Sequence, residues 1–242
     1  MADSPTLPGH ILVIGAHAGD AENMAAATVL KHTRAGCRAT ILHMTLGEAG
    51  HRTLPPEVYA EQRKREAQAA AERMGAQAIW LPYRDGELCA SEEIKLQVCD
   101  LIRREKPAVI LTHWKGSLHK DHVVTHQIVH DAIFYAALPT IRREWPAHSI
   151  RALYYPENWE DMDGWRPDLY LDVGDVWDDY LAVLRTHELM RGGISSFRYL
   201  EYYDALGTMR GCLAGFRKAT ALMVPPGSWV RKVGFLPGLE PA

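Results

Sequence analysis

Long apolar runs are missing from this 242-residue chain, in which no segment approaches the ~18 consecutive apolar residues of a membrane-spanning helix. The start, MADSPTLPGH, also lacks the basic residues and the apolar stretch of an export signal. Basic residues are not in excess either, since the formal net charge is −3 and no dense Lys/Arg run occurs. We therefore expect a cytoplasmic protein that binds neither membranes nor nucleic acid.

Cysteine is scarce, and its four copies, Cys37, Cys89, Cys99 and Cys212, never occur in C-x-x-C spacing. Thiolate metal sites and disulfide frameworks both require closely patterned cysteines. The spacing indicates neither kind of site, and we expect reduced thiols.

Hydrophobic residues make up 47% of the chain, enough for the core of a single domain over residues 1–242. Short apolar runs alternate with longer segments that favour helix. The runs predict strands at 11–15, 39–45, 78–83, 108–113, 151–156 and 168–173. The longer segments predict helices at 21–32, 56–74, 92–105, from about 119 onward, 176–190 and 206–218. This alternation predicts a Rossmann-like α/β fold, with a mainly parallel sheet and helices on both faces.

Polar residues follow three of the predicted strands at the point where each strand ends. His17 and Asp20 follow the first strand, Glu48 follows the second, and the segment 113–122 follows the fourth. Because sheets of this type bind ligands outside the carboxyl ends of their strands, we expect these side chains to form one site at one edge.

The segment AHAGD sets His17 and Asp20 three residues apart on a strand-to-helix turn, where both side chains can point to one place. The tetrad HKDH, at 119–122, lies where a helix is expected to begin and could supply a third ligand. Two histidines and one carboxylate with open positions form a catalytic zinc pattern, because the ion can lower the pKa of a water to ~7. The sequence therefore predicts one divalent metal ion, which we expect to be zinc.

These motifs resemble those of the PIG-L/LmbE-like de-N-acetylase family, zinc hydrolases that remove acetyl groups from amino sugars and related small molecules. The resemblance extends from about Ile11 to Ala137 and implies an LmbE-like fold. The family motifs A-H-P-D-D, T-x-G-E-x-G and H-x-D-H match AHAGD, TLGEAG and HKDH here. Its R-x-x-E-x-x-x-A motif matches residues 63–70, and its D-G turn matches Asp85 and Gly86.

By position, the resemblance places the zinc ligands at His17, Asp20 and His122. It also assigns stabilisation of an oxyanion to His119, and orientation of a neighbouring group to Asp121.

The chain departs from the family at Gly19, which stands where the first Asp of A-H-P-D-D acts as general base. A positioned general base contributes ~10² to 10⁴ in rate, and glycine cannot accept a proton. Glu48 or Asp121 would have to take over this role. A small residue at this position is also found in the 4-oxalomesaconate hydratase-like branch, which resembles this chain again at 165–180, WRPDLYLDVGDVWDDY.

Three functions are compatible with these residues. The preferred one is a zinc-dependent hydrolase that removes an N-acyl group from a small amino-sugar-like substrate through water activated by the metal. The alternative is a zinc-dependent hydratase of an unsaturated di- or tricarboxylic acid, with Glu48 moving the proton. The third is a non-catalytic metal-binding homologue, against which the retained His119 and Asp121 argue, because a structural zinc would not require them.

We expect the partner of the site to be a small-molecule substrate. Arginines that could hold an anionic substrate, because guanidinium offers paired donors to carboxylates, are Arg52, Arg63, Arg166 and Arg210. Solvation at the surface is the simpler explanation for any one of them. The resemblance further implies a homo-oligomer, either a trimer or a hexamer.

Overall fold

A seven-stranded sheet lies at the centre of the computed structural model, which describes residues 9–227. The strand order is β3-β2-β1-β4-β5-β7-β6. The strands are β1 (His10–Gly15), β2 (Arg38–Thr45), β3 (Gln77–Tyr83), β4 (Val109–Thr112), β5 (Ala152–Pro156), β6 (Leu169–Asp172) and β7 (Ala219–Met223). Strands β1 to β5 pair in parallel, whereas β7 is antiparallel to both β5 and β6.

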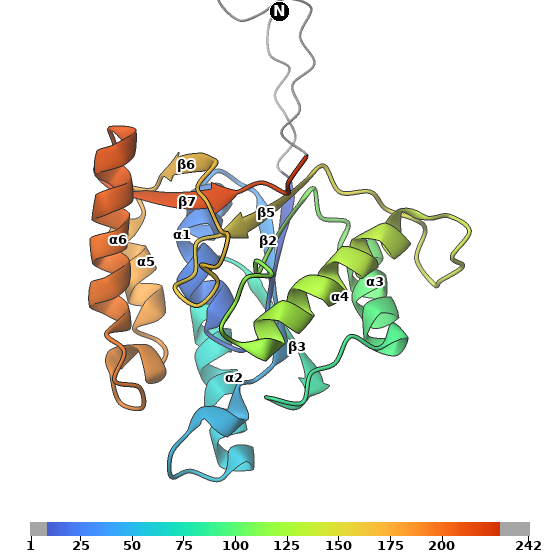
Figure 1. Ribbon diagram of the computed structural model, residues 1–242, viewed down its shortest axis with the longest axis horizontal. Coiled ribbons are helices and arrows are strands. Elements are labelled where there is room, and N and C mark those ends of the chain that lie inside the picture. The colour runs from blue at the N-terminus through green and yellow to red at the C-terminus, as the bar shows by residue number, and fades with distance from the viewer. Residues whose placement is uncertain (1–8, 228–242) are drawn as a thin grey trace, which may run out of the picture.

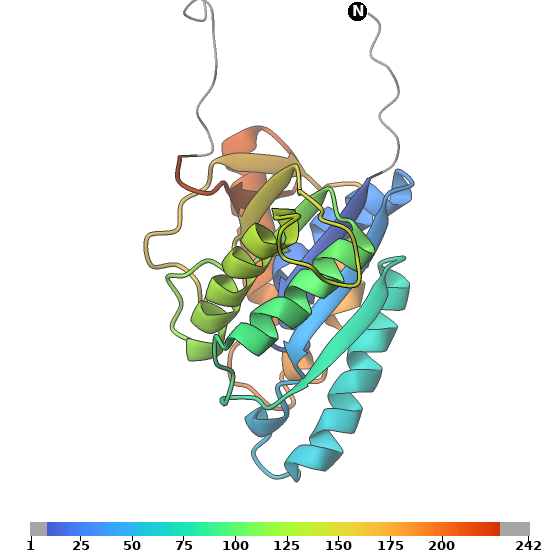
Figure 2. The ribbon, with the colours of Figure 1, turned by 90° about the vertical axis from the view of Figure 1, so that its right-hand side faces the viewer.

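Helices cover both faces of this sheet (Figure 1). They are α1 (Asp20–Arg34), α2 (Pro56–Arg73), α3 (Glu92–Glu105), α4 (Lys120–Ala137), α5 (Trp177–Leu184) and α6 (Tyr199–Ala214). Two short 3₁₀ helices, η1 (Glu48–Gly50) and η2 (Leu189–Arg191), lie in loops. Figure 2 shows α3 and α4 in front of the strands, while Figure 1 shows α1, α5 and α6 on the opposite side. The predicted α/β fold, with a mainly parallel sheet between helices, is confirmed.

Strand β1 is buried at every position, which explains its continuous apolar sequence. Because successive side chains of a strand point to opposite faces, its residues divide between two cores. Ile11 and Val13 pack with α1 and α5, whereas Leu12 and Ile14 pack with α3 and α4. Each such side chain, when fully buried, contributes roughly 1.5–3 kcal/mol to stability.

The predicted elements after residue 170 differ from the observed ones. Helix α5 ends at Leu184, short of the predicted 176–190, because the backbone around the buried His187 turns to meet α2. Helix α6 begins at Tyr199 and ends at Ala214, so the predicted helix 206–218 was placed too late. Strand β7, which begins at Ala219 directly after the predicted helix, was not predicted.

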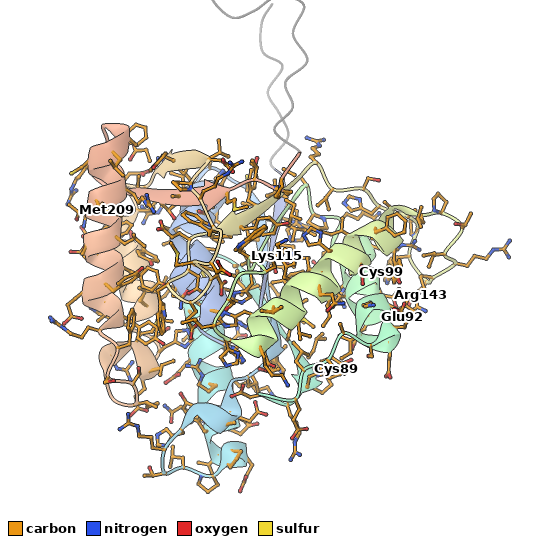
Figure 3. The ribbon with its side chains drawn as sticks, viewed as in Figure 1. Cys89, Glu92, Cys99, Lys115, Arg143 and Met209 are labelled. Carbon is orange, nitrogen blue, oxygen red and sulfur yellow. The ribbon has the colours of Figure 1, made fainter. Side chains whose placement is uncertain are left out.

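The four cysteines are free, as their spacing predicted. Cys99 is buried on α3, and Cys89 is exposed in the loop before that helix (Figure 3). Within residues 9–227, no helix is both long and apolar enough to cross a membrane.

The chain order of the sheet determines where a site can form. Strand β1 lies between β2 and β4 and is parallel to both. The chain adds β2 and β3 on one side of β1, and then β4 and β5 on the other side. This reversal of the strand order leaves a crevice outside the carboxyl ends of β1 and β4. The loops after β1, β2, β3, β4 and β5 all emerge at this edge.

Candidate metal centre

The turn after β1 brings two predicted metal ligands together. Gly19 has a φ of 103°, a left-handed conformation that favours glycine, and Asp20 is the first residue of α1. Oδ2 of Asp20 accepts a hydrogen bond from the backbone N–H of His17 over 2.8 Å, and it lies 2.9 Å from Nδ1 of the same histidine. The sharp turn thus fixes both side chains of the AHAGD motif.

The third predicted ligand, His122, reaches the same carboxylate from the first turn of α4. Its Nε2 lies 3.2 Å from Oδ2 of Asp20. Its Nδ1 lies 2.8 Å from Oδ1 of Asp161, and since a carboxylate can only accept, Nδ1 carries the proton of this hydrogen bond. Nε2 is then the bare nitrogen, and it is buried without a hydrogen-bond partner among residues 9–227. A carboxylate behind a histidine is the usual support of a metal ligand.

In His17 the two ring nitrogens have exchanged roles relative to His122, since Nε2 faces supporting carboxylates and Nδ1 faces Asp20. Its Nε2 lies 3.1 Å from Oδ1 of Asp85 and 3.4 Å from Oδ2 of Asp121. When Nε2–H donates to these carboxylates, Nδ1 is bare and faces Asp20. Asp85, for which the sequence most simply indicated a turn, is therefore part of the site.

The side chains around this point form three groups whose ligand atoms lie close enough to hold a metal ion: His17, His119 and His122; Asp20, His113 and His122; and His17, Asp85 and Asp121. Each group contains at least one of the three predicted ligands. One nitrogen of His17 and one of His122 lie 2.9 and 3.2 Å from the same carboxylate oxygen of Asp20. So close an arrangement requires positive charge, which either protons on the imidazoles or a metal ion can supply. Ligand atoms of a tetrahedral zinc ion, with bonds of about 2.0–2.1 Å, lie roughly 3.3 Å apart. The donor set of two imidazoles and one carboxylate also suits a catalytic divalent ion.

The electrostatics of the cluster favour positive charge. Burial opposes protonation of His122, but Asp20 and Asp161 outweigh burial and raise the pKa of His122 to about 10. Burial likewise opposes protonation of His17, yet the Asp20 carboxylate holds the pKa of His17 well above its ordinary value. Carboxylates that stabilise protonated imidazoles this strongly also provide the negative potential that a metal cation requires.

His119 is the N-cap residue of α4, and this role fixes its tautomer. Its Nδ1 accepts a hydrogen bond from the backbone N–H of Asp121 over 3.2 Å. The neutral ring therefore carries its proton on Nε2. Burial lowers the pKa of His119 below its ordinary value, and positive charge on the neighbouring His17 and His122 acts in the same direction, which favours the neutral ring. His119 can thus offer an N–H to an oxygen that becomes negative.

The other two predicted catalytic residues contact backbone amides. Oδ2 of Asp121 accepts from Gly86 N–H over 2.7 Å and faces His17, so the neighbour it orients is a metal-ligand candidate. Oε1 of Glu48 accepts from the N–H of Asp85 over 2.9 Å, and Glu48 does not line the cavity beside the cluster. Its catalytic role stays a prediction.

His113, the first residue of the segment 113–122, hydrogen-bonds groups next to the predicted metal ligands. Its Nε2 accepts from the N–H of Ala16 over 3.0 Å, and its Nδ1 lies 2.6 Å from Oδ2 of Asp161. Both ring nitrogens are therefore committed to the protein. Asp161 holds His113 and His122 at once.

A cavity of about 150 Å³ opens beside the cluster. It is lined by His17, Asp20, Gly47, Gly50, Tyr59, Arg63, Asp85, His119, His122, Glu160, Leu189 and Tyr199. Two residues near the cluster were not predicted from the sequence, Glu160 and the buried Asp161, and both follow β5. Like the other site residues, they follow the carboxyl end of a parallel strand, and this position could have identified them.

A family model described as GlcNAc-PI de-N-acetylase, PIG-L, matches residues 12–133, half of the chain. The chain belongs to the PIG-L family. The PIG-L match contains all three predicted metal ligands together with His119 and Asp121.

The relatives of this PIG-L protein include enzymes of two kinds. It is 27% identical over 234 residues to the diacetylchitobiose deacetylase of Thermococcus kodakarensis, which covers 90% of this chain and 83% of that protein. It is 26% identical over 216 residues to the 4-oxalmesaconate hydratase of Pseudomonas putida KT2440, which covers 84% of this chain and 80% of the relative. A deacetylase and a hydratase are thus similar to this chain over most of its length.

Solved structures of both kinds share the fold. The 4-carboxy-2-hydroxymuconate hydratase of Pseudomonas putida KT2440 superimposes with a TM-score of 0.83 at 22% identity, covering 94% of this chain and 99% of that one. The N,N'-diacetylchitobiose deacetylase of Pyrococcus horikoshii gives a TM-score of 0.79 at 20% identity, over 94% and 88% of the two chains. At these identities the likeness establishes the LmbE-like fold alone.

Proposed function

We propose that this PIG-L protein is a zinc-dependent hydrolase that removes an N-acyl group from a small amino-sugar-like substrate. The observation that carries the proposal is the convergence of His17, Asp20 and His122 beside a cavity into which His119 can present Nε2–H. When bound, zinc would polarise the acyl carbonyl and lower the pKa of a water molecule. The membership of deacetylases in the same family supports this choice.

The chain itself supplies the other parts of such a reaction. His119 would donate a hydrogen bond to the carbonyl oxygen as it gains negative charge, and a donor of this kind is worth ~10² to 10³ in rate. Asp161 and Asp121 would hold His122 and His17 in their orientations.

Glu160 is the residue to which we assign the proton transfer that Gly19 cannot perform. Its Oε2 lies 3.8 Å from Nε2 of His122, and its side chain is 21% exposed on the cavity wall. The alternatives, Glu48 and Asp121, each accept a hydrogen bond from a backbone amide, and Glu48 lies off the cavity.

A hydratase acting on an unsaturated di- or tricarboxylic acid is the second candidate. Gly19 favours it, because glycine stands where the resemblance places the general base of the deacetylases. In that reaction His119 would again donate a hydrogen bond to the substrate oxygen, and Glu160 would again transfer the proton.

Two assays on the zinc-loaded protein separate the candidates. A hydrolase releases acetate from a panel of N-acetylated amino sugars, whereas a hydratase removes the ultraviolet absorbance of conjugated enoic di- and tricarboxylic acids. Acetate release that disappears in Asp20→Ala would support the hydrolase. Loss of absorbance without acetate release would overturn it in favour of the hydratase, and inactivity in both assays would support a non-catalytic protein.

The remaining properties are proposals from the sequence and the resemblance. We propose a small-molecule partner, no nucleic-acid or membrane partner, a cytoplasmic location, and assembly into a trimer or hexamer.

A further inference from the structure

The turn between β1 and α1 carries two of the predicted metal ligands, but its own residues restrain it little. Where the family motif has Pro and Asp, this chain has Ala18 and Gly19. Gly19 has a φ of 103°, and glycine loses more backbone freedom on folding than any other residue. Contacts from the rest of the protein must therefore fix the conformation in which Asp20 faces His17 and His122.

One such contact is made by Glu22, in the first turn of α1. Its Oε2 accepts a hydrogen bond from the backbone N–H of Gly19 over 2.9 Å. Gly19 is the N-cap residue of α1, and a glutamate three residues later that accepts from the N-cap amide fixes the start of a helix. The side chain of Glu22 is fully buried, so water cannot readily replace it as the acceptor.

The other carboxylate oxygen of Glu22 faces two histidines, which are also fully buried. Oε1 lies 3.6 Å from Nε2 of His43, on β2, and 3.6 Å from Nε2 of His187, in the loop before η2. These distances are too long for hydrogen bonds, and Oε1 has no hydrogen-bond partner among residues 9–227. The hydrogen bond to the Gly19 amide is therefore the contact that ties this carboxylate to a particular group.

Two further side chains pack against the turn. A Cβ atom added to Gly19 would lie 3.0 Å from Nη2 of Arg63 and 3.3 Å from Cε of Met190. Arg63 is 2% exposed, so it is not the solvated surface residue that the sequence suggested. These contacts fill the space beside Gly19, whereas Glu22 supplies the hydrogen-bond acceptor for its amide.

We propose that Glu22 is a positioning residue of the metal centre, because its carboxylate holds the Gly19 amide and so keeps Asp20 in place. Asp20 directly follows Gly19, and its Oδ2 accepts from the N–H of His17 only while the turn keeps its shape. The inference rests on the proposed function only through the metal centre. It gives Glu22 an influence on metal affinity without making it a ligand.

Two substitutions at Glu22 separate this role from general stabilisation of the fold. Glu22→Met has a similar size but no acceptor, so it leaves the Gly19 amide buried without a partner. We expect its zinc affinity to fall by about tenfold, the lower end of the usual cost of losing a contact that supports a metal ligand. Glu22→Gln keeps an oxygen that can accept from the Gly19 amide, and its zinc affinity should stay close to that of the wild type.

Glu66→Gln is the matched control for stability. Oε2 of Glu66 lies 3.6 Å from Nδ1 of His187, on the side of that ring away from Glu22. The substitution therefore weakens the same buried cluster but leaves the bond between Glu22 and the Gly19 amide intact. It should unfold more easily than the wild type and yet bind zinc with wild-type affinity. Competition with a fluorescent zinc chelator gives the affinities, at a temperature where thermal unfolding shows every full-length variant to be folded.

Wild-type zinc affinity in folded Glu22→Met would overturn the inference. An equal loss of affinity in Glu66→Gln would do the same, because affinity would then follow the stability of the buried cluster. If Glu22→Met does not fold, Glu22→Asp decides the question, since its shorter side chain keeps the charge but not the reach to the Gly19 amide, and it should show the same loss. A wild-type protein that binds no zinc would instead contradict the proposed function, so the two failures are distinguishable.

Discussion

The Nδ1 atom of His122 donates a hydrogen bond to Oδ1 of Asp161 over 2.8 Å, and this contact turns the opposite nitrogen toward Asp20. Asp161 is fully buried and comes from the loop after β5, whereas His122 lies on α4. The orientation of a metal-ligand candidate therefore depends on a residue 39 positions away.

Replacing this buried carboxylate should weaken metal binding. Asp161→Asn keeps the shape of the side chain but lacks the negative charge that favours Nδ1–H on His122. We expect zinc affinity to fall by about 10- to 100-fold, the usual effect of losing such a partner. Competition with a fluorescent zinc chelator measures the change, with the exposed Asp178→Asn as control. Unchanged affinity in Asp161→Asn would refute the supporting role.

The proposed catalytic role of His119 can be tested separately from its structural role as the N-cap of α4. In His119→Asn the side chain can still cap the helix, since Asn is a preferred N-cap residue, but Nε2–H is lost. We expect kcat to fall by about 10²- to 10³-fold, with zinc content and thermal stability close to those of the wild type. A drop in activity that matches a loss of zinc would show that His119 serves the metal instead.

The assignment of the proton transfer to Glu160 predicts different effects at two glutamates. Glu160→Gln should lower kcat by about 10²- to 10⁴-fold, the contribution of a positioned acid or base. Glu48→Gln should have a small effect, because its amide oxygen can still accept from Asp85 N–H. The reverse order of effects, measured at equal zinc content, would return the role to Glu48.

Stability should depend on pH through Glu66. Burial raises the pKa of Glu66, but hydrogen bonds from His187, Gln62 and the N–H of Glu188 outweigh it and lower the pKa to about 2. A carboxyl group with a lowered pKa stabilises the fold above its unfolded pKa of 4.5 and loses this effect as pH falls toward 2.

Glu66→Gln should therefore unfold more easily than the wild type at pH 7. The difference in the free energy of unfolding should shrink as the pH falls from 4.5 toward 2. Urea titrations at several pH values measure it, and the exposed Glu61→Gln serves as control. A difference that is constant over this range would rule out the ionised carboxylate as its source.

Local sequence was sufficient to predict the first half of the fold. The apolar runs and their helical partners gave the elements from β1 to α4 within a few residues, because each has a strong period or a clear composition. Helix α6 was harder, since it contains Gly207 and Gly211, which local propensity disfavours. The ring of Trp177 packs where a Cβ on Gly207 would lie, so tertiary packing explains that glycine.

The candidate site was predictable to a similar extent. Polar residues at strand ends predicted that His17, Asp20 and the segment after β4 lie together. Asp161 lies beyond the end of the strand predicted at 151–156 and was not predicted. The environment of Arg63 could not be foreseen, because its burial depends on how α2 packs against the turns at Gly19 and Gly47.

The most direct test of the account is the metal content of the purified protein after dialysis against zinc and then against metal-free buffer. Elemental analysis should find one zinc ion per chain in the wild type, and close to none in Asp20→Ala. A variant at a carboxylate outside the cluster, Asp172→Asn, should retain the ion. Retention of zinc by Asp20→Ala, or a wild-type protein that holds none, would contradict the metal centre proposed at His17, Asp20 and His122.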